Sequence, residues 1–297
     1  MKLSVVIGTY NQKDSLKLVL GSFEDQTAPK DSFEVVLVDS SSSDGTDKMI
    51  ADLKHTFDLN YIRQEDLGRP GARNRGIKEA KGEIILLTDA DMIAHEKLVE
   101  EHIKCHEECG NVAIEGLTYN LKRLENYRSP DNLTPYIQKE PKAKQKLHWM
   151  YFLSGNLSLR KETAVKAGLF DPMFTGYGWE DIELGYRVHK LGMPIIYLPS
   201  AKNYHYHIVS DEGMLERKYN MGLSAAKFYK KHPNKEVKNF LGMHPAVMAI
   251  YVFMKSNKWL LDIIKKRAAK GSYFNNMVLQ EYNYREGLTD ALKKGKA

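Results

Sequence analysis

Short apolar runs alternate with segments of helical spacing over the first hundred residues of the chain. The runs are rich in Val, Ile and Leu, which predicts buried strands. Between them, apolar residues recur every three or four positions, which predicts amphipathic helices. Strands alternating with helices indicate βαβ units, so we expect an α/β fold with a mostly parallel central sheet flanked by helices. The expected strands cover residues 3–8, 34–39, 59–63 and 83–88.

The pattern beyond residue 92 predicts further strands and helices around one irregular segment. A helix is expected as far as about Gly110, followed by a strand at VAIEGLTY. Residues 120–150 are rich in Lys, Pro and Asn, and a loop of that length in a compact domain is typically a functional flap. The segment FLSGNLSLRKETAVKAGLFD then predicts a strand and a helix, and GYGWEDIELGYRVHKLG predicts a helix. Two strand-like pieces, PIIYLP and KNYHYHI, follow.

Charge is distributed unevenly along the 297 residues. Residues 210–297 carry 17 Lys and Arg against 8 Asp and Glu, whereas residues 1–209 carry 27 against 30. We therefore expect a basic helical extension after the α/β region. Its most apolar stretch, AVMAIYVFM, is far shorter than the roughly 20 residues of a membrane-spanning helix. Basic residues flank this stretch, namely Lys255, Lys258, Lys265, Lys266 and Arg267.

Two interpretations of the basic extension remain open. An amphipathic helix could lie in the interface of an anionic membrane, or a helix could pack on the main domain and leave a solvated basic face. The packed helix is the simpler alternative and is favoured. Binding to a nucleic acid is not expected, because the extension lacks aromatic residues interleaved with the basic ones.

The cysteines and the N-terminus indicate a cytoplasmic protein. Cys105 and Cys109 lie four residues apart in an expected helix, which fits neither a zinc site nor a disulfide framework and favours a reducing compartment. The first residues, MKLSVVIGTYN, lack the apolar core and cleavage site of a signal peptide, so they are interpreted as the first strand.

Polar residues gather where the expected strands end. Thr9, Tyr10 and Asn11 follow the first strand, DSSSSD at 39–44 follows the second, and 89–91 follow the fourth. Ligands of open α/β sheets bind beyond the C-terminal ends of the strands. The chain contains neither GxGxxG after its first strand nor a P-loop, so a nucleotide would have to be held differently.

Asp89 and Asp91 end the apolar run IILLTDADM, where an unpaired carboxylate would be costly to bury. One explanation is that they cap the next helix. The other is that two carboxylates at positions i and i+2 hold a divalent cation through oxygen ligands.

Six segments in order resemble the inverting family 2 glycosyltransferases. They are SVVIGTYN, VLVDSSSSDGT, GRPGARNRGIKEAKGEIILLTDADM, SGNLSLRKE, FDPMFTGYGWEDIELGYRVHKLG and YHYH. The resemblance implies the A-type (GT-A) nucleotide-diphospho-sugar transferase fold. It places a catalytic domain at 1–209, with a nucleotide-binding half at 1–110 and an acceptor and catalytic half at 111–209, before the helical extension at 210–297. The WED segment also resembles galactosyltransferase-like enzymes, including chondroitin-type polymerase domains.

The resemblance implies roles for individual residues in binding a UDP-sugar. Thr9 and Tyr10 would border the uracil, and Asp39 would accept a hydrogen bond from its imide N–H. Further contacts to the nucleotide-sugar would come from Asp44, Arg73, Asp89, Ala90, Asn156 and Trp179. The sequence departs from many family members at Gly8, where proline is common, and glycine permits the same exit from the strand.

Catalysis needs a neutralised diphosphate and a base for the acceptor hydroxyl. By the resemblance, Asp91 would ligate Mn²⁺ or Mg²⁺, and a histidine, His205 or His207, would favour manganese. The two histidines share one face of a strand, and the sequence does not choose between them. Asp181 is the expected base and Glu180 would contact sugar hydroxyls; for Asp181 the alternative is a charge that favours the helix dipole.

Four candidates also have structural alternatives. Either histidine could be a hydrogen-bonded structural residue, Trp179 could belong to a core rather than stack on a sugar, and Asn156 could serve a turn.

The expected function is metal-dependent, inverting transfer of a Gal, GalNAc or GlcNAc type sugar from a UDP-sugar to a glycan or glycolipid of the cell surface. The protein would be cytoplasmic, with peripheral contact to the inner face of the membrane through its basic extension. A nucleotidyltransferase would need a basic Gly-rich loop after the first strand, and GTYNQKD does not provide one. A non-catalytic nucleotide- or carbohydrate-binding module is the other alternative.

Overall fold

The computed structural model describes residues 1–121, 133–137, 139–206 and 211–294. The chain divides into two compact units. The first comprises Met1–Pro172 and Glu180–Ile208, and the second comprises Met173–Trp179 and Val209–Ala297. The division at 208/209 falls next to the expected boundary at 209/210. Residues 173–179, expected in the first domain, group instead with the helical extension.

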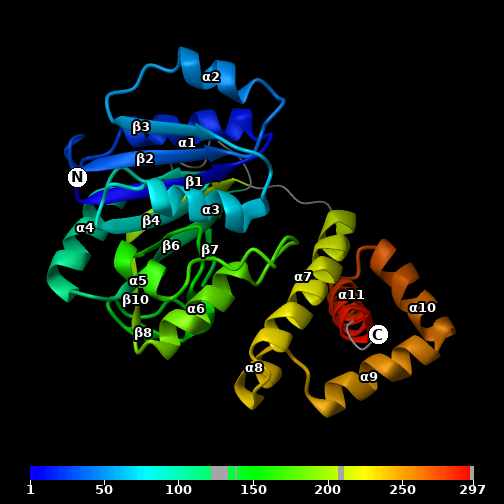
Figure 1. Ribbon diagram of the computed structural model, residues 1–297. Helices are drawn as coiled ribbons and strands as arrows, with labels where there is room; N and C mark the ends of the chain where they lie inside the picture. The colour runs from blue at the N-terminus through cyan, green and yellow to red at the C-terminus, as the bar shows by residue number, and fades with distance from the viewer. Residues whose placement is uncertain (122–132, 138, 207–210, 295–297) are drawn as a thin grey trace. The chain divides into compact units, whose positions relative to one another are not determined.

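The first unit is a mixed α/β unit built on one sheet, in the order β3-β2-β1-β4-β9-β6-β10-β5 (Figure 1). Long parallel ladders join β1 to β2 and β4, β2 to β3, and β6 to β10, while β9 runs antiparallel to both of its neighbours. The central sheet flanked by helices is therefore confirmed. Its strands are β1 (Leu3–Thr9), β2 (Phe33–Asp39), β3 (Asp58–Arg63), β4 (Ile84–Asp89), β5 (Met92–Ala94), β6 (Ala113–Leu121), β7 (Thr134–Pro135), β8 (Lys146–Leu147), β9 (Leu157–Arg160) and β10 (Ile195–Tyr206).

Helices cover both faces of the sheet because successive strand residues point to opposite sides. Leu3, Val5 and Ile7 of β1 pack in one core with residues of α1, whereas Val6 faces α3. A Cβ on Gly76 of α3 would lie 2.4 Å from Val6 Cγ1, so glycine permits the close approach of α3. The helices of this unit are α1 (Lys13–Glu24), α2 (Thr46–Asp52), α3 (Gly68–Glu79), α4 (Leu98–Cys109), α5 (Lys161–Lys166) and α6 (Glu180–Lys190), with the 3₁₀ helix η2 (Trp149–Tyr151).

The two strand-like pieces expected after residue 193 form one strand. In β10 the pairing with β6 shifts between Leu198 and Lys202, and Pro199 lies inside this irregularity, where its missing N–H costs no ladder bond. Part of the expected flap, residues 122–132 and 138, lies outside the described residues. The described remainder adds β7 to the edge of β6 and β8 to β10.

The second unit is helical. Its longest helices, α7 and α11, cross closely because of two glycines: a Cβ on Gly222 would meet Tyr284 O at 2.0 Å, and one on Gly287 would meet Tyr219 O at 2.1 Å. Of the helices described, none has the length and apolarity needed to cross a membrane. The helices are α7 (Asp211–Lys231), α8 (Lys235–Phe240), α9 (Pro245–Ser256), α10 (Lys258–Ala269) and α11 (Tyr273–Lys294).

Candidate active site

Three expected strand ends meet at one edge of the sheet. In the parallel ladders Thr9 of β1 pairs with Asp39 of β2, and Gly8 pairs with Asp89 of β4. Because β1 lies between β2 and β4, the polar residues after all three strands are neighbours. The sheet therefore assembles a single polar edge from segments that are up to eighty residues apart in sequence.

The loops after β1 and β2 are tied to each other. Asn11 adopts φ 51°, a left-handed conformation that asparagine tolerates better than most residues. Its N–H donates to Ser42 Oγ at 2.9 Å, and its Oδ1 accepts from the Ser43 N–H at 2.8 Å. The Ser40 N–H donates to Thr9 O at 3.0 Å. These bonds fix the serine-rich loop against the exit of the first strand.

Asp39, the residue expected to bind uracil, is fully buried. Its Oδ1 accepts from the Ser42 N–H at 2.9 Å and its Oδ2 from the Tyr61 hydroxyl at 2.8 Å. Burial, together with the hydrogen bond and charge of Asp39, raises the pKa of Tyr61. In this conformation Asp39 thus anchors the loop, and a nucleobase could use only its remaining lone pairs. Tyr61 was not among the expected site residues.

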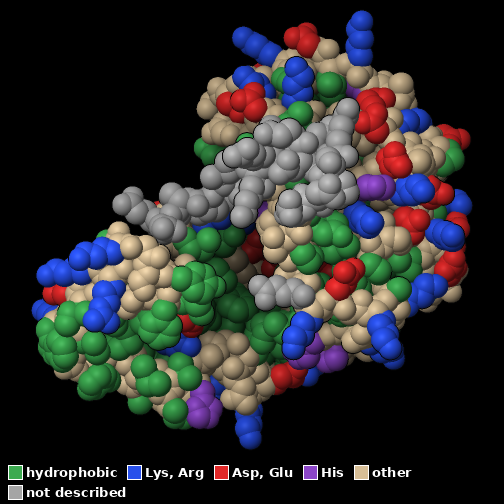
Figure 2. All heavy atoms as spheres, turned by 180° about the vertical axis from the view of Figure 1, so that it is seen from behind, with side chains coloured by type: hydrophobic (Ala, Val, Ile, Leu, Met, Phe, Trp, Pro, Cys, Tyr) green, Lys and Arg blue, Asp and Glu red, His purple; other side chains and the backbone are tan. Residues whose placement is uncertain are grey.

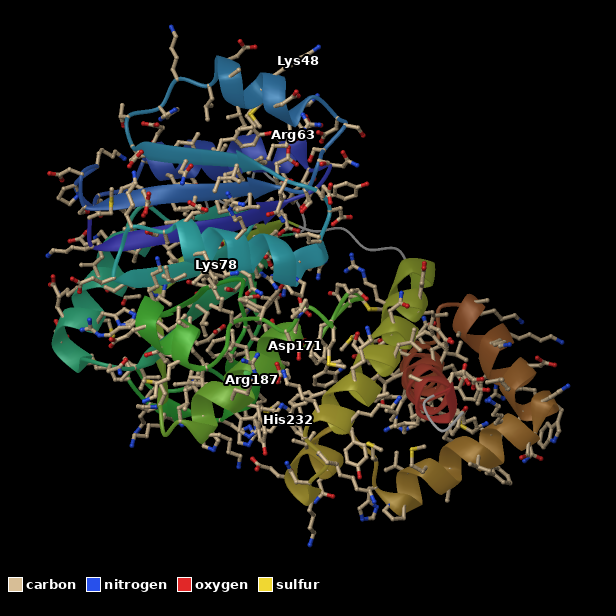
Figure 3. The ribbon with its side chains drawn as sticks, in the orientation of Figure 1. Lys48, Arg63, Lys78, Asp171, Arg187 and His232 are labelled. Carbon is tan, nitrogen blue, oxygen red and sulfur yellow. The ribbon has the colours of Figure 1, made fainter. Side chains whose placement is uncertain are left out.

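Asp44 stabilises the starts of two helices. It accepts from the Lys13 N–H at 2.8 Å, at the start of α1, and from Thr46 Oγ1 at 2.6 Å, at the start of α2. Burial acts to raise the pKa of Asp44, but these hydrogen bonds outweigh it and lower the pKa. Arg63, at the end of β3 in Figure 3, supports the same loop through Ser42 O at 3.0 Å.

Thr9 and Tyr10 lie next to each other but differ in exposure. Thr9 is buried, and its hydroxyl has no hydrogen-bond partner within the described structure. Tyr10 is exposed at the strand end. An exposed aromatic ring on a polar edge can stack against a planar ligand, and a buried unpartnered hydroxyl can act as a hydrogen-bond donor.

The two aspartates of the DAD segment have separate partners. Asp89 Oδ1 accepts from Arg73 Nη2 at 2.8 Å, whereas Asp91 Oδ2 lies 3.4 Å from His205 Nε2. Ala90 between them is buried. The element that follows is the strand β5, and α4 begins only at Leu98. Neither aspartate therefore caps a helix, which removes the capping alternative.

His205 is oriented by two contacts. The Tyr136 hydroxyl hydrogen-bonds to its Nδ1, so that Nε2 faces Asp91. With the proton on Nδ1, the lone pair of Nε2 would be available to a cation, and Tyr136 would fix that tautomer. His207 lies outside the described residues.

Asp91 and His205 fit a divalent cation only as a partial ligand set. In the parts of the chain that the structure describes, no three His, Cys, Asp or Glu side chains form a group that could hold a metal. A carboxylate and an imidazole suit Mn²⁺ or Mg²⁺ if phosphate oxygens of a nucleotide and water supply the other ligands.

Arg73 joins this edge to the start of α6. The side chain is buried and donates to Asp89 at 2.8 Å and to Glu180 Oε1 at 3.1 Å, with its guanidinium 5.3 Å from the centre of the Phe170 ring. Burial acts to lower the pKa of Arg73, but the carboxylates of Asp89, Glu180 and Asp181 outweigh it and raise the pKa. A permanently charged group therefore links the expected nucleotide and catalytic residues.

Asp181 is a half-buried carboxylate with a perturbed pKa. Its Oδ1 accepts from the Ile182 N–H at 2.7 Å, and its Oδ2 lies 3.4 Å from the Ser154 N. Burial raises the pKa of Asp181 to about 6, the Glu180 carboxylate acts in the same direction, and Arg73 acts against both. A carboxylate of this kind is ionised at pH 7 yet basic enough to accept a proton.

Glu115 on β6 is a second buried carboxyl near this point. Its Oε2 accepts a hydrogen bond from the Leu153 N–H at 3.2 Å. The next residue, Ser154, is the one that contacts Asp181. Burial, with the charge of Asp181 adding to it, raises the pKa of Glu115 well above its usual range. The sequence analysis missed this residue, although a glutamate inside the apolar strand VAIEGLTY was a usable signal.

The remaining three candidates have other structural roles or partners. Glu180 is buried, and its Oε2 has no hydrogen-bond partner within the described structure. Asn156 is also buried, and its amide bonds to His102 Nε2 at 2.9 Å and Ala201 O at 3.0 Å. Trp179 belongs to the helical unit, where its Nε1 donates to Met221 O at 2.8 Å. The geometry of Asn156 and Trp179 thus matches the structural alternatives.

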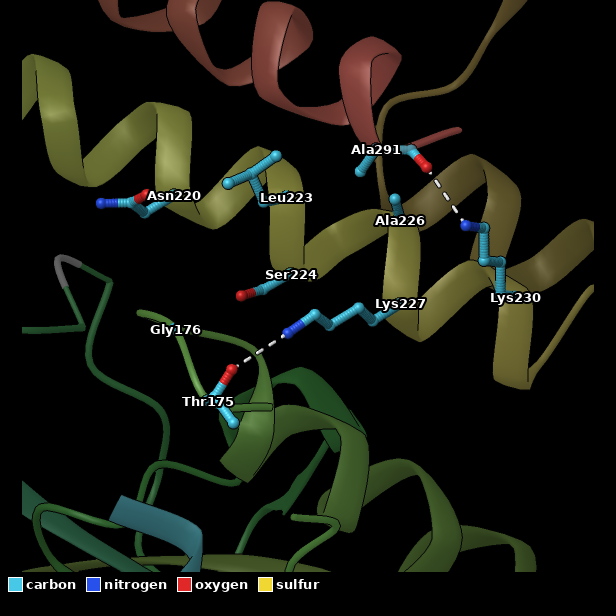
Figure 4. Close-up of a pocket in the computed structure, with 9 residues that line it drawn as sticks. All are labelled: Thr175, Gly176, Asn220, Leu223, Ser224, Ala226, Lys227, Lys230 and Ala291. Carbon is cyan, nitrogen blue, oxygen red and sulfur yellow. Dashed lines mark hydrogen bonds between the residues drawn. The ribbon is translucent and has the colours of Figure 1, made fainter. Parts of the chain in front are cut away.

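A separate cavity of about 400 Å³ lies in the helical unit (Figure 4). Lys227 Nζ bonds to Met173 O at 2.7 Å and lies 3.4 Å from Thr175 Oγ1, which holds the segment before Trp179 against α7. The buried Ser224 hydroxyl has no partner within the described structure. None of the expected site residues lines this cavity. The lining residues are Thr175, Gly176, Asn220, Leu223, Ser224, Ala226, Lys227, Lys230 and Ala291.

Comparison with known sequences identifies related proteins. The model of a family described as Glycosyl transferase family 2 matches residues 4–168, more than half of the chain, and one described as N-terminal domain of galactosyltransferase matches residues 134–211. Validoxylamine A glucosyltransferase of Streptomyces hygroscopicus subsp. limoneus is 27% identical over 268 residues, or 78% of this chain and 57% of that protein. Chondroitin synthase of Escherichia coli is 24% identical over 277 residues, or 78% of this chain and 38% of that protein.

A third relative, the uncharacterized glycosyltransferase YfnE of Bacillus subtilis (strain 168), is 29% identical over 242 residues, or 65% of this chain and 62% of that protein. The chain thus spans between 38% and 62% of the length of these relatives.

Solved structures share the fold. Residues 1–349 of S. aureus TarS in complex with UDP align with a TM-score of 0.58 at 19% identity, over 99% of this chain and 92% of that one. The mannosyltransferase PcManGT of Pyrobaculum calidifontis, in complex with GDP-Man and Mn²⁺, aligns with a TM-score of 0.66 at 17% identity, over 100% of this chain and 88% of that one. Together with the family match over more than half of the sequence, this likeness identifies the protein as a member of glycosyl transferase family 2, a glycosyltransferase with the GT-A fold.

Proposed function

We propose that the protein is an inverting, metal-dependent glycosyltransferase that moves a sugar from a UDP-sugar to a glycan or glycolipid acceptor in cell-surface polysaccharide synthesis. The observation that carries the proposal is the buried Arg73, which bonds to both Asp89 and Glu180. Through it, the polar edge expected to bind the donor is held in fixed relation to Asp181, the candidate base.

Inversion requires the acceptor hydroxyl to attack the anomeric carbon from the side opposite the leaving diphosphate. Asp181 would accept the hydroxyl proton, and its pKa of about 6 leaves it mostly ionised at neutral pH. Asp91 and His205 would hold Mn²⁺ or Mg²⁺, which supplies Lewis-acid stabilisation of the diphosphate. Tyr10 would stack on the nucleobase, and Asp44 would keep the serine-rich loop in place.

The donor is inferred from chemistry and from relatives. TarS is described in complex with UDP and with UDP-GlcNAc, and two of the matched relatives are chondroitin synthases. These names favour a uridine nucleotide with a Gal, GalNAc or GlcNAc type sugar. PcManGT is described with GDP-Man, so guanosine nucleotides belong in the same test.

The test is a panel of UDP-sugars and GDP-Man with Mn²⁺, Mg²⁺ or EDTA, in which sugar release and product anomers are measured. Asp181→Asn should lower turnover by about a thousandfold or more while it still binds UDP, because general-base groups contribute roughly 10²–10⁴-fold. Asp14→Asn is the matched control, since Asp14 also occupies the first turn of a helix.

The outcomes distinguish the alternatives. Turnover that survives in Asp181→Asn would show that this residue is not the base. Binding of UDP without turnover of any donor would favour a non-catalytic nucleotide-binding module. Activity that is unchanged in EDTA would contradict the role given to Asp91 and His205.

A further inference from the structure

The helical unit exposes a cluster of large apolar side chains on three consecutive helices. In the described residues, Phe253 is 60% exposed on α9, Trp259 is 65% exposed on α10, and Phe274 is 71% exposed at the start of α11. Figure 2 shows apolar side chains gathered over α9 and α10 beside Lys and Arg side chains. We call this set the α9–α11 face, and its members are Ile250, Val252, Phe253, Trp259, Ile263, Tyr273, Phe274 and Met277.

The helices α9 and α10 bury few of their apolar side chains. Tyr251 is the only buried residue of α9 and Ala268 the only one of α10, whereas α1, which has the same length, buries five residues. The spacing is helical, because Trp259 and Ile263 lie four positions apart on one side of α10. The sequence analysis favoured a packed helix with only a basic face in solvent. In the structure, α9 and α10 also expose large apolar side chains to solvent.

The lengths of α9 and α10 suit helices that lie on a membrane surface and are too short for helices that cross a bilayer. A helix of twelve residues is roughly 18 Å long at 1.5 Å per residue, against a hydrocarbon thickness of about 30 Å. The composition fits the region between lipid headgroups and chains, where Trp and Tyr concentrate. At roughly 150–250 Å² per aromatic side chain, the four exposed aromatics together expose on the order of 500 Å².

Charge decides between two occupants of the face. From Pro245 to Lys270 the chain has six basic residues and one acidic residue, Asp262. A second copy of the chain placed on the same face would bring two basic surfaces together, which is repulsive. An anionic lipid surface attracts juxtaposed Lys and Arg and accepts the apolar side chains between its headgroups.

We propose that the α9–α11 face docks the protein on the surface of an anionic lipid bilayer. The aromatic side chains insert at the level of the headgroups, while Lys258, Lys265, Lys266, Arg267 and Lys270 contact anionic phosphates. This interaction goes beyond sugar transfer and does not depend on which donor the enzyme uses.

The test is flotation of the full chain with vesicles of phosphatidylglycerol and phosphatidylcholine in equal amounts, compared with phosphatidylcholine alone. The double variant Trp259→Ser, Phe274→Ser should reduce binding by about tenfold or more, because affinity scales with the apolar area inserted. The double variant Lys265→Glu, Lys266→Glu should also reduce binding to the anionic vesicles, and so should high salt, because both weaken the attraction between basic side chains and anionic headgroups. The control is Val165→Ser on α5, an apolar residue that is similarly exposed in the α/β unit.

A second readout comes from tryptophan emission. Trp149 is buried and Trp179 is half-buried, so a blue shift on addition of vesicles should come from Trp259 and disappear in Trp259→Phe. Equal flotation of wild type and the double variant would overturn the proposal, as would equal binding to neutral vesicles at any salt concentration. A concentration-dependent dimer that the double variant dissolves would show that a second copy occupies the face instead.

Discussion

Replacement of Asp181 by asparagine should lower turnover strongly and also make the α/β unit more stable at neutral pH. The folded protein raises the pKa of this carboxyl to about 6, against about 3.9 in an unfolded chain. Between these values the folded state keeps a proton that the unfolded state has lost. Stability therefore falls as pH rises through this range, and the ionised carboxylate lowers stability at every higher pH.

The size of the effect follows from the shift. About two pKa units at 1.36 kcal/mol each correspond to an upper bound of about 3 kcal/mol at pH 8. Asparagine removes the charge but keeps a carbonyl oxygen that can accept from the Ile182 N–H, as Oδ1 does now. The amide NH₂ of asparagine replaces Oδ2, the acceptor near the Ser154 N–H, and this loss offsets part of the stabilisation. We therefore expect the unfolding free energy to rise by roughly 1–3 kcal/mol at pH 8 and hardly at all at pH 4.

The assay is urea unfolding at pH 4, 6 and 8, and it must report the α/β unit alone. Trp179→Phe with Trp259→Phe leaves Trp149, which packs 5.1 Å from the Tyr186 ring of α6. Asp14→Asn, the same change at an exposed aspartate in the first turn of α1, serves as the control. A gain that is equal at pH 4 and pH 8, or no gain at pH 8, would refute the account of Asp181 as a carboxylate destabilised by burial.

Three further predictions concern packing and buried charge. Arg73→Gln should lower the unfolding free energy of the α/β unit by about 3–5 kcal/mol, measured in urea, because it removes the buried cation of Glu180 and leaves that carboxylate only the exposed Arg69, 4.0 Å away. Glu115→Gln should leave kcat/KM at pH 7 almost unchanged, since glutamine keeps the acceptor for the Leu153 N–H and burial acts against the charged form of this carboxyl, whereas Glu115→Leu should cost about 1–3 kcal/mol by removing the acceptor of this part-buried N–H. Gly287→Ala should destabilise the helical unit by about 1–3 kcal/mol in thermal unfolding, while Gly21→Ala, where added volume meets nothing within 4 Å, should stabilise α1 by up to about 1 kcal/mol.

The polar edge could be predicted from sequence because it depends on local patterns and one general rule. The periodicity placed Thr9, Asp39 and Asp89 at strand ends, and parallel strands bring such ends to one side of a sheet. The observed ladders have this arrangement, and they confirm the α/β fold. What lies at the edge is therefore encoded in short segments of the chain.

The partners of these residues could not be predicted in the same way. Tyr61 reaches Asp39 because β3 pairs with β2, and Arg73 reaches Glu180 across 107 positions in sequence. Such contacts depend on strand order and helix placement, which no local pattern contains. The role of Trp179 was open for a related reason, because only the tertiary structure shows that its segment groups with the helical unit.

The choice of histidine shows how register adds to periodicity. The alternation in YHYH puts His205 and His207 on the same face of a strand, so the sequence gives both the same direction. In the structure, β10 pairs antiparallel with β5, and His205 lies opposite Met92, the residue after Asp91. The bond from the Tyr206 N–H to Asp91 O, 3.0 Å, extends this pairing by one step.

Because this register brings the His205 ring to the Asp91 carboxylate, His205→Ala should weaken Mn²⁺-dependent turnover by about 10–100-fold, the usual effect of disturbing groups at a metal site. Tyr136→Phe should weaken Mn²⁺-dependent turnover less, because the phenylalanine ring still packs beside His205 and only the hydroxyl that orients its Nδ1 is lost. An equal loss of turnover in His205→Ala and Tyr136→Phe would show that Tyr136 acts on the donor itself.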